Sequence, residues 1–145
     1  MENHDYNATI HVNVTAQEAF EKISSVSEWW ISNVEGNTQK LNDVFTVSLG
    51  TTWKKFKIIE VVPDKKVVWL ITDCCLPWND DTTEWKNTRI VWEVSATKDS
   101  TQISFTHVGL GDLDCGNQCM NSWNNYIKQS LFNFITKGKG LPNKF

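Results

Sequence analysis

Residues 116–136 have the sequence GNQCMNSWNNYIKQSLFNFIT. Its large apolar side chains recur at steps of three and four residues, the spacing of one face of an α-helix. The members of this stripe are Met120, Trp123, Ile127, Leu131, Phe134 and Ile135. Lysine and glycine follow over residues 137–140, and both suit the C-terminus of a helix. The pattern predicts a long amphipathic helix with Asp114 as its N-cap.

The chain before this helix predicts an antiparallel sheet. Apolar and polar residues alternate over 6–14, which indicates a strand with one buried face and His11 on the other. Thr15 and Glu18 form a capping-box pattern at the start of a helix of about ten residues, and a further helical turn is expected over 27–31. Five more strands joined by short turns are predicted over 44–49, 53–62, 67–72, 90–96 and 103–107. The long helix must then lie across the concave face of this sheet.

Composition and charge narrow the class of protein. The chain has 145 residues, a formal net charge of −3 and a pI near 5.6, and its 14 basic residues are scattered. Such a surface does not suit phosphates, so we expect no nucleic-acid partner. Residues 1–5 form neither a basic nor an apolar leader, and no apolar run is long enough to span a bilayer. We expect one cytoplasmic domain over residues 1–145, a monomer or homodimer without membrane insertion.

The four cysteines could be free thiols or zinc ligands. Cys74 and Cys75 are adjacent, whereas Cys115 and Cys119 are four apart, and without a secretory leader we expect reduced thiols. The C-x3-C spacing falls in the zinc-ligand range, but a vicinal pair is poor geometry for one tetrahedral ion, so we expect no metal site. Cys115 lies near the positive end of the predicted helix, which would lower the pKa of its thiol.

The eight tryptophans are the unusual feature of the composition. Indoles are seldom fully buried and their N–H groups need partners, so such an excess suits walls that face a partly wet space. The alternative is a solid core that is rich in tryptophan. The sequence leaves both interpretations open.

Four phrases in the sequence resemble one superfamily. They are Trp29-Trp30, Val61-Val62-Pro63-Asp64-Lys65-Lys66-Val67-Val68-Trp69, Thr101-Gln102-Ile103-Ser104-Phe105-Thr106-His107-Val108-Gly109-Leu110, and Ser122-Trp123-Asn124-Asn125-Tyr126-Ile127-Lys128 leading to Lys137-Gly138. In this order, covering Tyr6 to Gly138, they resemble the START-like superfamily, and more closely the branch related to the C-terminal domain of the activator of the Hsp90 ATPase.

The resemblance implies an α+β helix-grip fold: a curved antiparallel sheet wrapped around a long C-terminal helix, with two short helices after the first strand. It also implies an internal cavity between sheet and helix. Members of the superfamily range from lipid and hormone carriers to cyclases and aromatases, so the fold leaves function open. A chaperone partner is not the favoured expectation, because the chain lacks a further domain to grip one.

We predict that the cavity binds a small hydrophobic or aromatic ligand without a cofactor. The residues predicted to bind it are Trp29, Trp30, Phe45, Trp53, Trp69, Phe105, His107, Trp123, Tyr126 and Ile127. His107 shares its strand face with Ile103 and Phe105, so it can orient a polar group of the ligand or be hydrogen-bonded within the structure.

Two other functions stay open. In an enzyme, His107 would transfer a proton, but the sequence contains no catalytic motif, and the glycines of 109–112 lack the third glycine of a dinucleotide loop, so we assign no catalytic residue. In an interaction protein, exposed Trp78, Trp85 or the Trp29-Trp30 pair would dock the partner.

Overall fold

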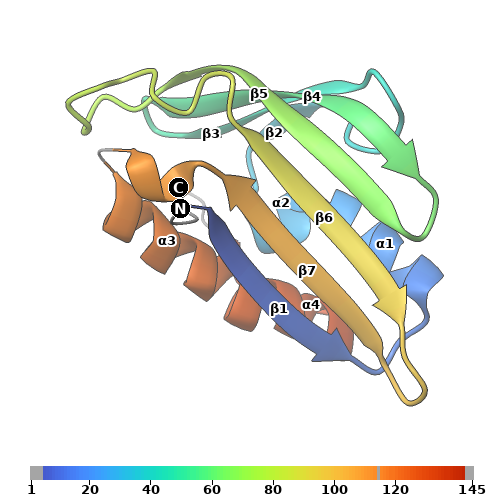
Figure 1. Cartoon of the computed structure of the whole chain (residues 1–145). Helices are drawn as coiled ribbons and strands as arrows, with labels where there is room; N and C mark the ends of the chain where they lie inside the picture. The colour runs from blue at the N-terminus through green and yellow to red at the C-terminus, as the bar shows by residue number, and fades with distance from the viewer. Residues whose placement is uncertain (1–4, 114, 143–145) are drawn as a thin grey trace.

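The computed structural model describes residues 5–113 and 115–142, which form a curved sheet with helices on its concave face (Figure 1). The sheet has seven antiparallel strands in the order β1-β7-β6-β5-β4-β3-β2. The strands are β1 (Tyr6–Val12), β2 (Val34–Gly36), β3 (Val44–Leu49), β4 (Thr52–Val62), β5 (Lys66–Cys75), β6 (Arg89–Ala96) and β7 (Thr101–Val108). The helices are α1 (Ala16–Ser24), α2 (Val26–Trp29), η1 (Leu110–Asp112), α3 (Gly116–Asn125), η2 (Tyr126–Leu131) and α4 (Phe132–Lys137).

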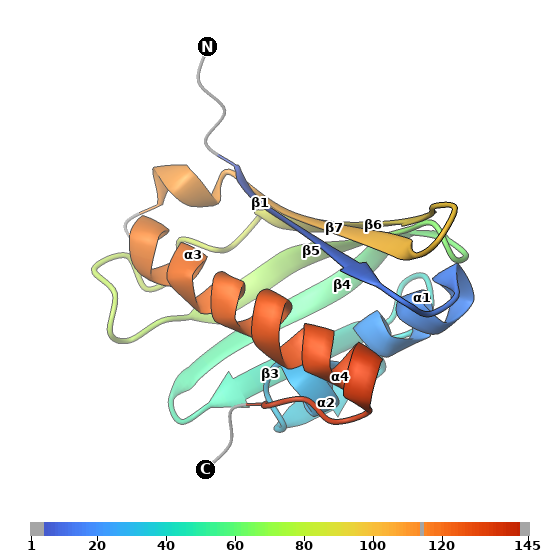
Figure 2. The same cartoon turned by 90° about the horizontal axis from the view of Figure 1, so that it is seen from below.

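The long C-terminal helix consists of α3, η2 and α4, and it crosses the concave face of the sheet (Figure 2). The predicted helix-grip architecture is confirmed. The alternation in β1 is also as predicted, because its odd-numbered exposed positions, His11 among them, face away from the core. Two features were missed: the short edge strand β2, and the π-helical geometry of η2, which carries no obvious sequence signal. The predicted N-cap Asp114 lies outside the described residues.

Local interactions fix the start of α1 and the end of α4 at the positions that the sequence predicts. The Thr15 hydroxyl accepts a hydrogen bond from the Glu18 backbone N–H at 3.1 Å and so caps α1. Gly138 ends α4 with φ +81°, a conformation that glycine adopts without steric cost.

The segment after α4 folds back onto the body of the protein. Gly140 is so close to α2 that a Cβ there would meet the Glu28 carbonyl oxygen at 2.4 Å. The buried Ser130 hydroxyl donates to the Trp29 carbonyl and accepts from the Leu141 N–H at 2.7 Å. One hydroxyl therefore joins three segments that are far apart in the sequence.

A β-bulge between β4 and β5 determines which side chains face the helix. Phe56 pairs with Ile71, but Lys55 pairs with Asp73, so β5 carries an extra residue, Thr72, at this point. Before the bulge, odd-numbered residues of β5 such as Ile71 face inward. After the bulge the phase is reversed, and even-numbered Cys74 faces inward. The bulge therefore places the buried thiol of Cys74 opposite Lys54 and leaves Asp73 on the other face.

The centre of the protein is solid rather than hollow. Six of the eight tryptophans are buried, and their rings contact one another and the phenylalanines directly. Trp30 and Trp123 have centroids 4.8 Å apart, Phe45 stacks on Phe56 at 4.8 Å, and Trp92 contacts Phe105 at 4.7 Å. The prediction that these rings border an interior hollow is wrong for the middle of the molecule, because sheet and helix are close enough for the rings to interlock.

Candidate functional site

A cleft of about 210 Å³ opens at one end of the molecule, between the sheet and the first half of the long helix. We call it the end cleft. Its lining residues come from positions 30–31 directly after α2, the β3–β4 hairpin, the loop over 76–88, and α3 with the start of η2. They are Trp30, Ile31, Leu49, Thr52, Lys54, Trp78, Trp85, Gln118, Cys119, Ser122, Trp123 and Tyr126.

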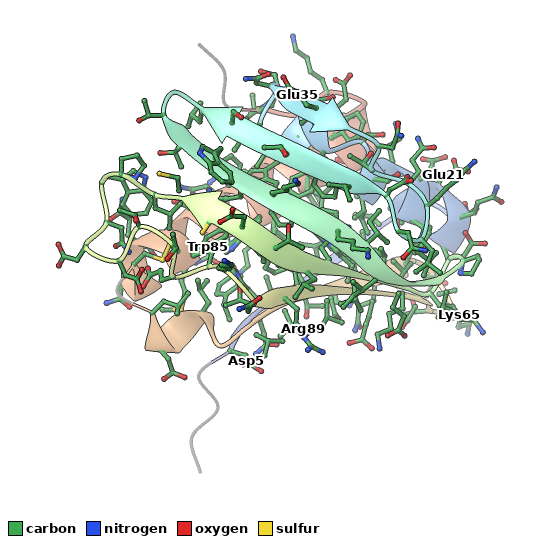
Figure 3. The ribbon with its side chains drawn as sticks, turned by 90° about the horizontal axis from the view of Figure 1, so that it is seen from above. Asp5, Glu21, Glu35, Lys65, Trp85 and Arg89 are labelled. Carbon is green, nitrogen blue, oxygen red and sulfur yellow. A yellow bond between two sulfur atoms is a disulfide. The ribbon has the colours of Figure 1, made fainter. Side chains whose placement is uncertain are left out.

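Aromatic rings dominate the walls of the end cleft. Trp85 stacks on Trp123 with centroids 6.0 Å apart and an interplanar angle of 21°, and Trp123 in turn contacts Trp30. Figure 3 places Trp85 at the opposite end of the sheet from Lys65, which lies in the β4–β5 turn. Trp78 stands at the rim with 48% of its surface exposed, and its Nε1 donates to the Thr52 hydroxyl at 3.1 Å. The cleft is thus open to solvent but has wide apolar faces inside.

Among the residues that the structure describes, Lys54 is the one basic side chain that lines the end cleft. Its Nζ lies 4.5 Å from the ring centroid of Trp85 and 5.5 Å from that of Trp30, so both indoles can stabilise the ammonium charge. Burial lowers the pKa of Lys54 to about 8, and the charge that Cys74 would carry acts in the opposite direction. No carboxylate among residues 5–113 and 115–142 makes an ion pair with this amine.

The neighbours of Lys54 are neutral. Burial raises the pKa of the Cys74 thiol, although backbone hydrogen bonds around Trp85 and Lys86 oppose the effect, so the thiol stays protonated at neutral pH. Burial, with a smaller contribution from the Lys54 charge, lowers the pKa of His107 to about 3. The positive charge in the end cleft is therefore not compensated by either group.

His107 is sealed behind the wall of the cleft. The ring is fully buried, and it packs edge-on against Trp85 with centroids 4.7 Å apart. Its Nδ1 accepts a hydrogen bond from Trp123 Nε1 at 3.2 Å. Its Nε2 lies 3.0 Å from the Thr88 hydroxyl, whose own hydrogen goes to the Trp85 carbonyl, so Nε2 is the protonated nitrogen. Both nitrogens are engaged, which leaves none for a ligand or for proton transfer.

The ten residues predicted from the sequence divide into three groups. Three line the end cleft: Trp30, Trp123 and Tyr126. Six are packed in the core and do not line the cleft: Trp29, Phe45, Trp69, Phe105, His107 and Ile127. The last, Trp53, does not line it either, because the alternation of β4 turns Lys54 and Phe56 inward and Trp53 outward.

Sequence reasoning missed the other nine cleft residues, among them Lys54, Trp78, Trp85 and Cys119. A signal for Lys54 was present, because it occupies the same alternating phase as Phe56 and Ile58, where an apolar residue is expected. The approach of the loop over 76–88 to α3 could not be deduced from spacing.

A disulfide joins Cys115 and Cys119 across the first turn of α3, with their Cα atoms 5.6 Å apart. The expectation of reduced thiols is wrong for this pair and holds for Cys74 and Cys75, which are free. Trp85 Nε1 lies 3.3 Å from the Cys115 sulfur, and the Cys115 backbone N–H donates to Glu84 Oε2 at 2.9 Å. These contacts fasten the loop to the start of α3, beside the cleft.

Other functions would require a cluster of metal ligands, a membrane-spanning helix or an exposed aromatic surface. Within residues 5–113 and 115–142, no three His, Cys, Asp or Glu side chains gather as they would around a metal ion. None of the helices described there is long and apolar enough to cross a bilayer. Of the tryptophans considered above for docking a partner, Trp29, Trp30 and Trp85 are each no more than 3% exposed, whereas Trp78 is 48% exposed.

Solved structures of other proteins share this fold. The Aha1 dimer from Colwellia psychrerythraea is 19% identical, with a TM-score of 0.78 over 94% of this chain and 98% of that one. DynU16, from the dynemicin biosynthetic locus, is 13% identical, with a TM-score of 0.73 over 96% of this chain and 49% of that one. Protein SSP2350 from Staphylococcus saprophyticus is 13% identical, with a TM-score of 0.69 over 94% of this chain and 95% of that one.

These likenesses establish the fold. The chain has the α+β helix-grip fold that its sequence predicts, and the Aha1 structure shares this fold. No protein-family model and no curated protein sequence matches the chain.

Proposed function

We propose that the end cleft binds a small aromatic molecule. The observation that carries this proposal is the cleft itself, a solvent-open space of about 210 Å³ whose inner faces are the rings of Trp30, Trp85, Trp123 and Tyr126. An engineered apolar cavity of about 150 Å³ holds benzene, so the end cleft has room for one substituted ring rather than for a lipid or a steroid. Indole faces favour a planar ligand, because offset or edge-on ring contacts add stabilisation beyond the burial of apolar surface.

The rigidity of the site supports binding. Trp85 is held by its contacts with His107, Trp123 and the Cys115 sulfur, and those partners are buried. A wall whose side chains are already fixed loses little conformational entropy when a ligand arrives. Trp78 alone among the cleft's indoles is exposed, so it is the ring that a ligand would cover.

The experiment is a titration of the purified protein with benzene derivatives and indole, followed by tryptophan fluorescence and by thermal melting. We expect saturable quenching and a melting temperature that rises with ligand concentration. Trp78→Ala should weaken binding several-fold. Trp53→Ala, which removes an indole from the opposite face of β4, should leave it unchanged. Failure of every compound to alter either signal at millimolar concentration, or equal weakening by both substitutions, would reject the proposal.

A further inference from the structure

Lys54 is an unexpected residue at its position in β4. It follows Thr52 and precedes Phe56 and Ile58 on the face of the strand that packs toward the helix, and both of those later side chains are fully buried. Lysine can extend its amine to solvent along an apolar surface. Here the amine instead lies over the rings of Trp85 and Trp30, inside the end cleft.

The strand register keeps the Asp73 carboxylate away from Lys54. If β4 and β5 kept the register that pairs Phe56 with Ile71, Asp73 would lie directly opposite Lys54, on the same face of the sheet. The extra residue Thr72 shifts the pairing, so Lys54 faces the Cys74 thiol instead. Glu84 is one of three acidic residues in the loop over 76–88, and its Oε2 accepts from Asn79 Nδ2 at 2.7 Å and from the Cys115 N–H at 2.9 Å.

We propose that Lys54 is the group that recognises an anionic oxygen of the ligand, so that the end cleft selects a small aromatic carboxylate over its neutral analogues. This inference rests on the proposed function and narrows it to one chemical class. A carboxylate would complete an ion pair whose positive half is already in place, while its ring covers the indole faces. The neutral states of His107 and Cys74 leave that charge available to the ligand.

Polar groups on the helix side of the cleft suit the second carboxylate oxygen. Gln118 and Ser122 line the cleft from α3, facing the β4 side that carries Lys54. Their amide and hydroxyl groups can donate hydrogen bonds to an oxygen that Lys54 does not reach. Charge-assisted hydrogen bonds in a half-buried site are stronger than neutral ones, which is the basis of the expected selectivity.

The test compares two probes of equal shape, benzoate and benzamide, by isothermal titration calorimetry at pH 6.5. The wild-type protein should bind benzoate at least about tenfold more tightly than benzamide. Lys54→Met should remove the preference by weakening benzoate and not benzamide. Lys54→Gln is the second variant, since it keeps a polar group there. Lys55→Met is the matched control, because Lys55 is exposed on the other face of β4, and it should keep the preference.

The outcomes separate the two proposals. Equal binding of both probes by the wild-type protein would overturn the inference and leave the proposed function standing. A preference for benzoate that survives both Lys54 substitutions, or that Lys55→Met also abolishes, would overturn it as well, because the charge responsible would lie elsewhere. If neither these probes nor the neutral compounds bind, both proposals fail.

Discussion

Acid should destabilise this protein through a single buried side chain, His107. Its ring is fully buried and hydrogen-bonded through both nitrogens, and burial lowers its pKa from 6.5 to about 3. A histidine whose folded-state pKa is lowered contributes full stability above its unfolded-state pKa. That contribution is lost as the pH falls through 6.5 toward 3, because His107 becomes protonated in the unfolded chain but stays neutral in the folded chain.

The magnitude follows from the two pKa values. At pH 5 the unfolded-state histidine is almost fully protonated and the folded-state one is neutral, which lowers the free energy of unfolding by about 2 kcal/mol relative to pH 7.5. Near pH 3 the loss should reach about 4 kcal/mol, close to the whole stability of a marginally stable domain.

The assay is urea denaturation followed by circular dichroism at pH 7.5 and pH 5.0, for the wild-type protein and for His107→Asn. Asparagine keeps an acceptor for Trp123 Nε1 but does not titrate. The variant should be less stable than the wild type at pH 7.5. The decrease in its free energy of unfolding from pH 7.5 to pH 5.0 should nevertheless be about 2 kcal/mol smaller than the decrease in the wild type. His11→Asn, at an exposed position, serves as the control. Equal losses in the wild type and in His107→Asn would refute the reasoning.

Three further changes have defined outcomes. Lys54→Met should raise the free energy of unfolding at pH 7 by up to about 3 kcal/mol, because folding lowers the pKa of the amine from 10.5 to about 8. Denaturation at pH 7 and pH 10.5 should show that most of this gain disappears at the higher pH, and a loss of stability at pH 7 would contradict the prediction. Replacing Cys115 and Cys119 with serine should lower stability by about 2 kcal/mol, and a reductant should then alter the melting of the wild type alone. Gly140→Ala should lower the free energy of unfolding by about 1 to 3 kcal/mol, because the new Cβ would clash with the Glu28 carbonyl oxygen. Denaturant titration measures this change, and an unchanged midpoint would show that the backbone shifts without cost to relieve the clash.

The fold was predictable because its signals are local and periodic. The stripe on residues 116–136 predicts the long helix, and the alternation of β1 and β7 predicts which faces are buried, with His107 on the inner face. Short polar turns between strands fix the antiparallel order. The three-residue edge strand β2 was missed because so short a segment carries almost no periodic signal.

The site was predicted only in part, because it depends on distances between segments that are remote in the sequence. Of the ten residues predicted to bind a ligand, Trp30, Trp123 and Tyr126 line the end cleft. The spacing of tryptophans along the chain did not reveal whether their rings would interlock or stand apart, and the structure shows them interlocked. Nor did it reveal the bulge at Thr72, which depends on how β5 pairs with β4. Alternation in β4 did contain the signal for Lys54.

The hydroxyl of Ser130 has a consequence for how the chain unfolds. Termini usually fray, and their amides exchange with solvent quickly. The amide of Leu141, in the tail that follows α4, donates to a buried oxygen that also bonds to the Trp29 carbonyl. Its hydrogen can exchange only when the tail detaches from the Ser130 hydroxyl. Slow isotope exchange at this one exposed leucine would therefore report on how firmly the segment after α4 is held against α2 and η2.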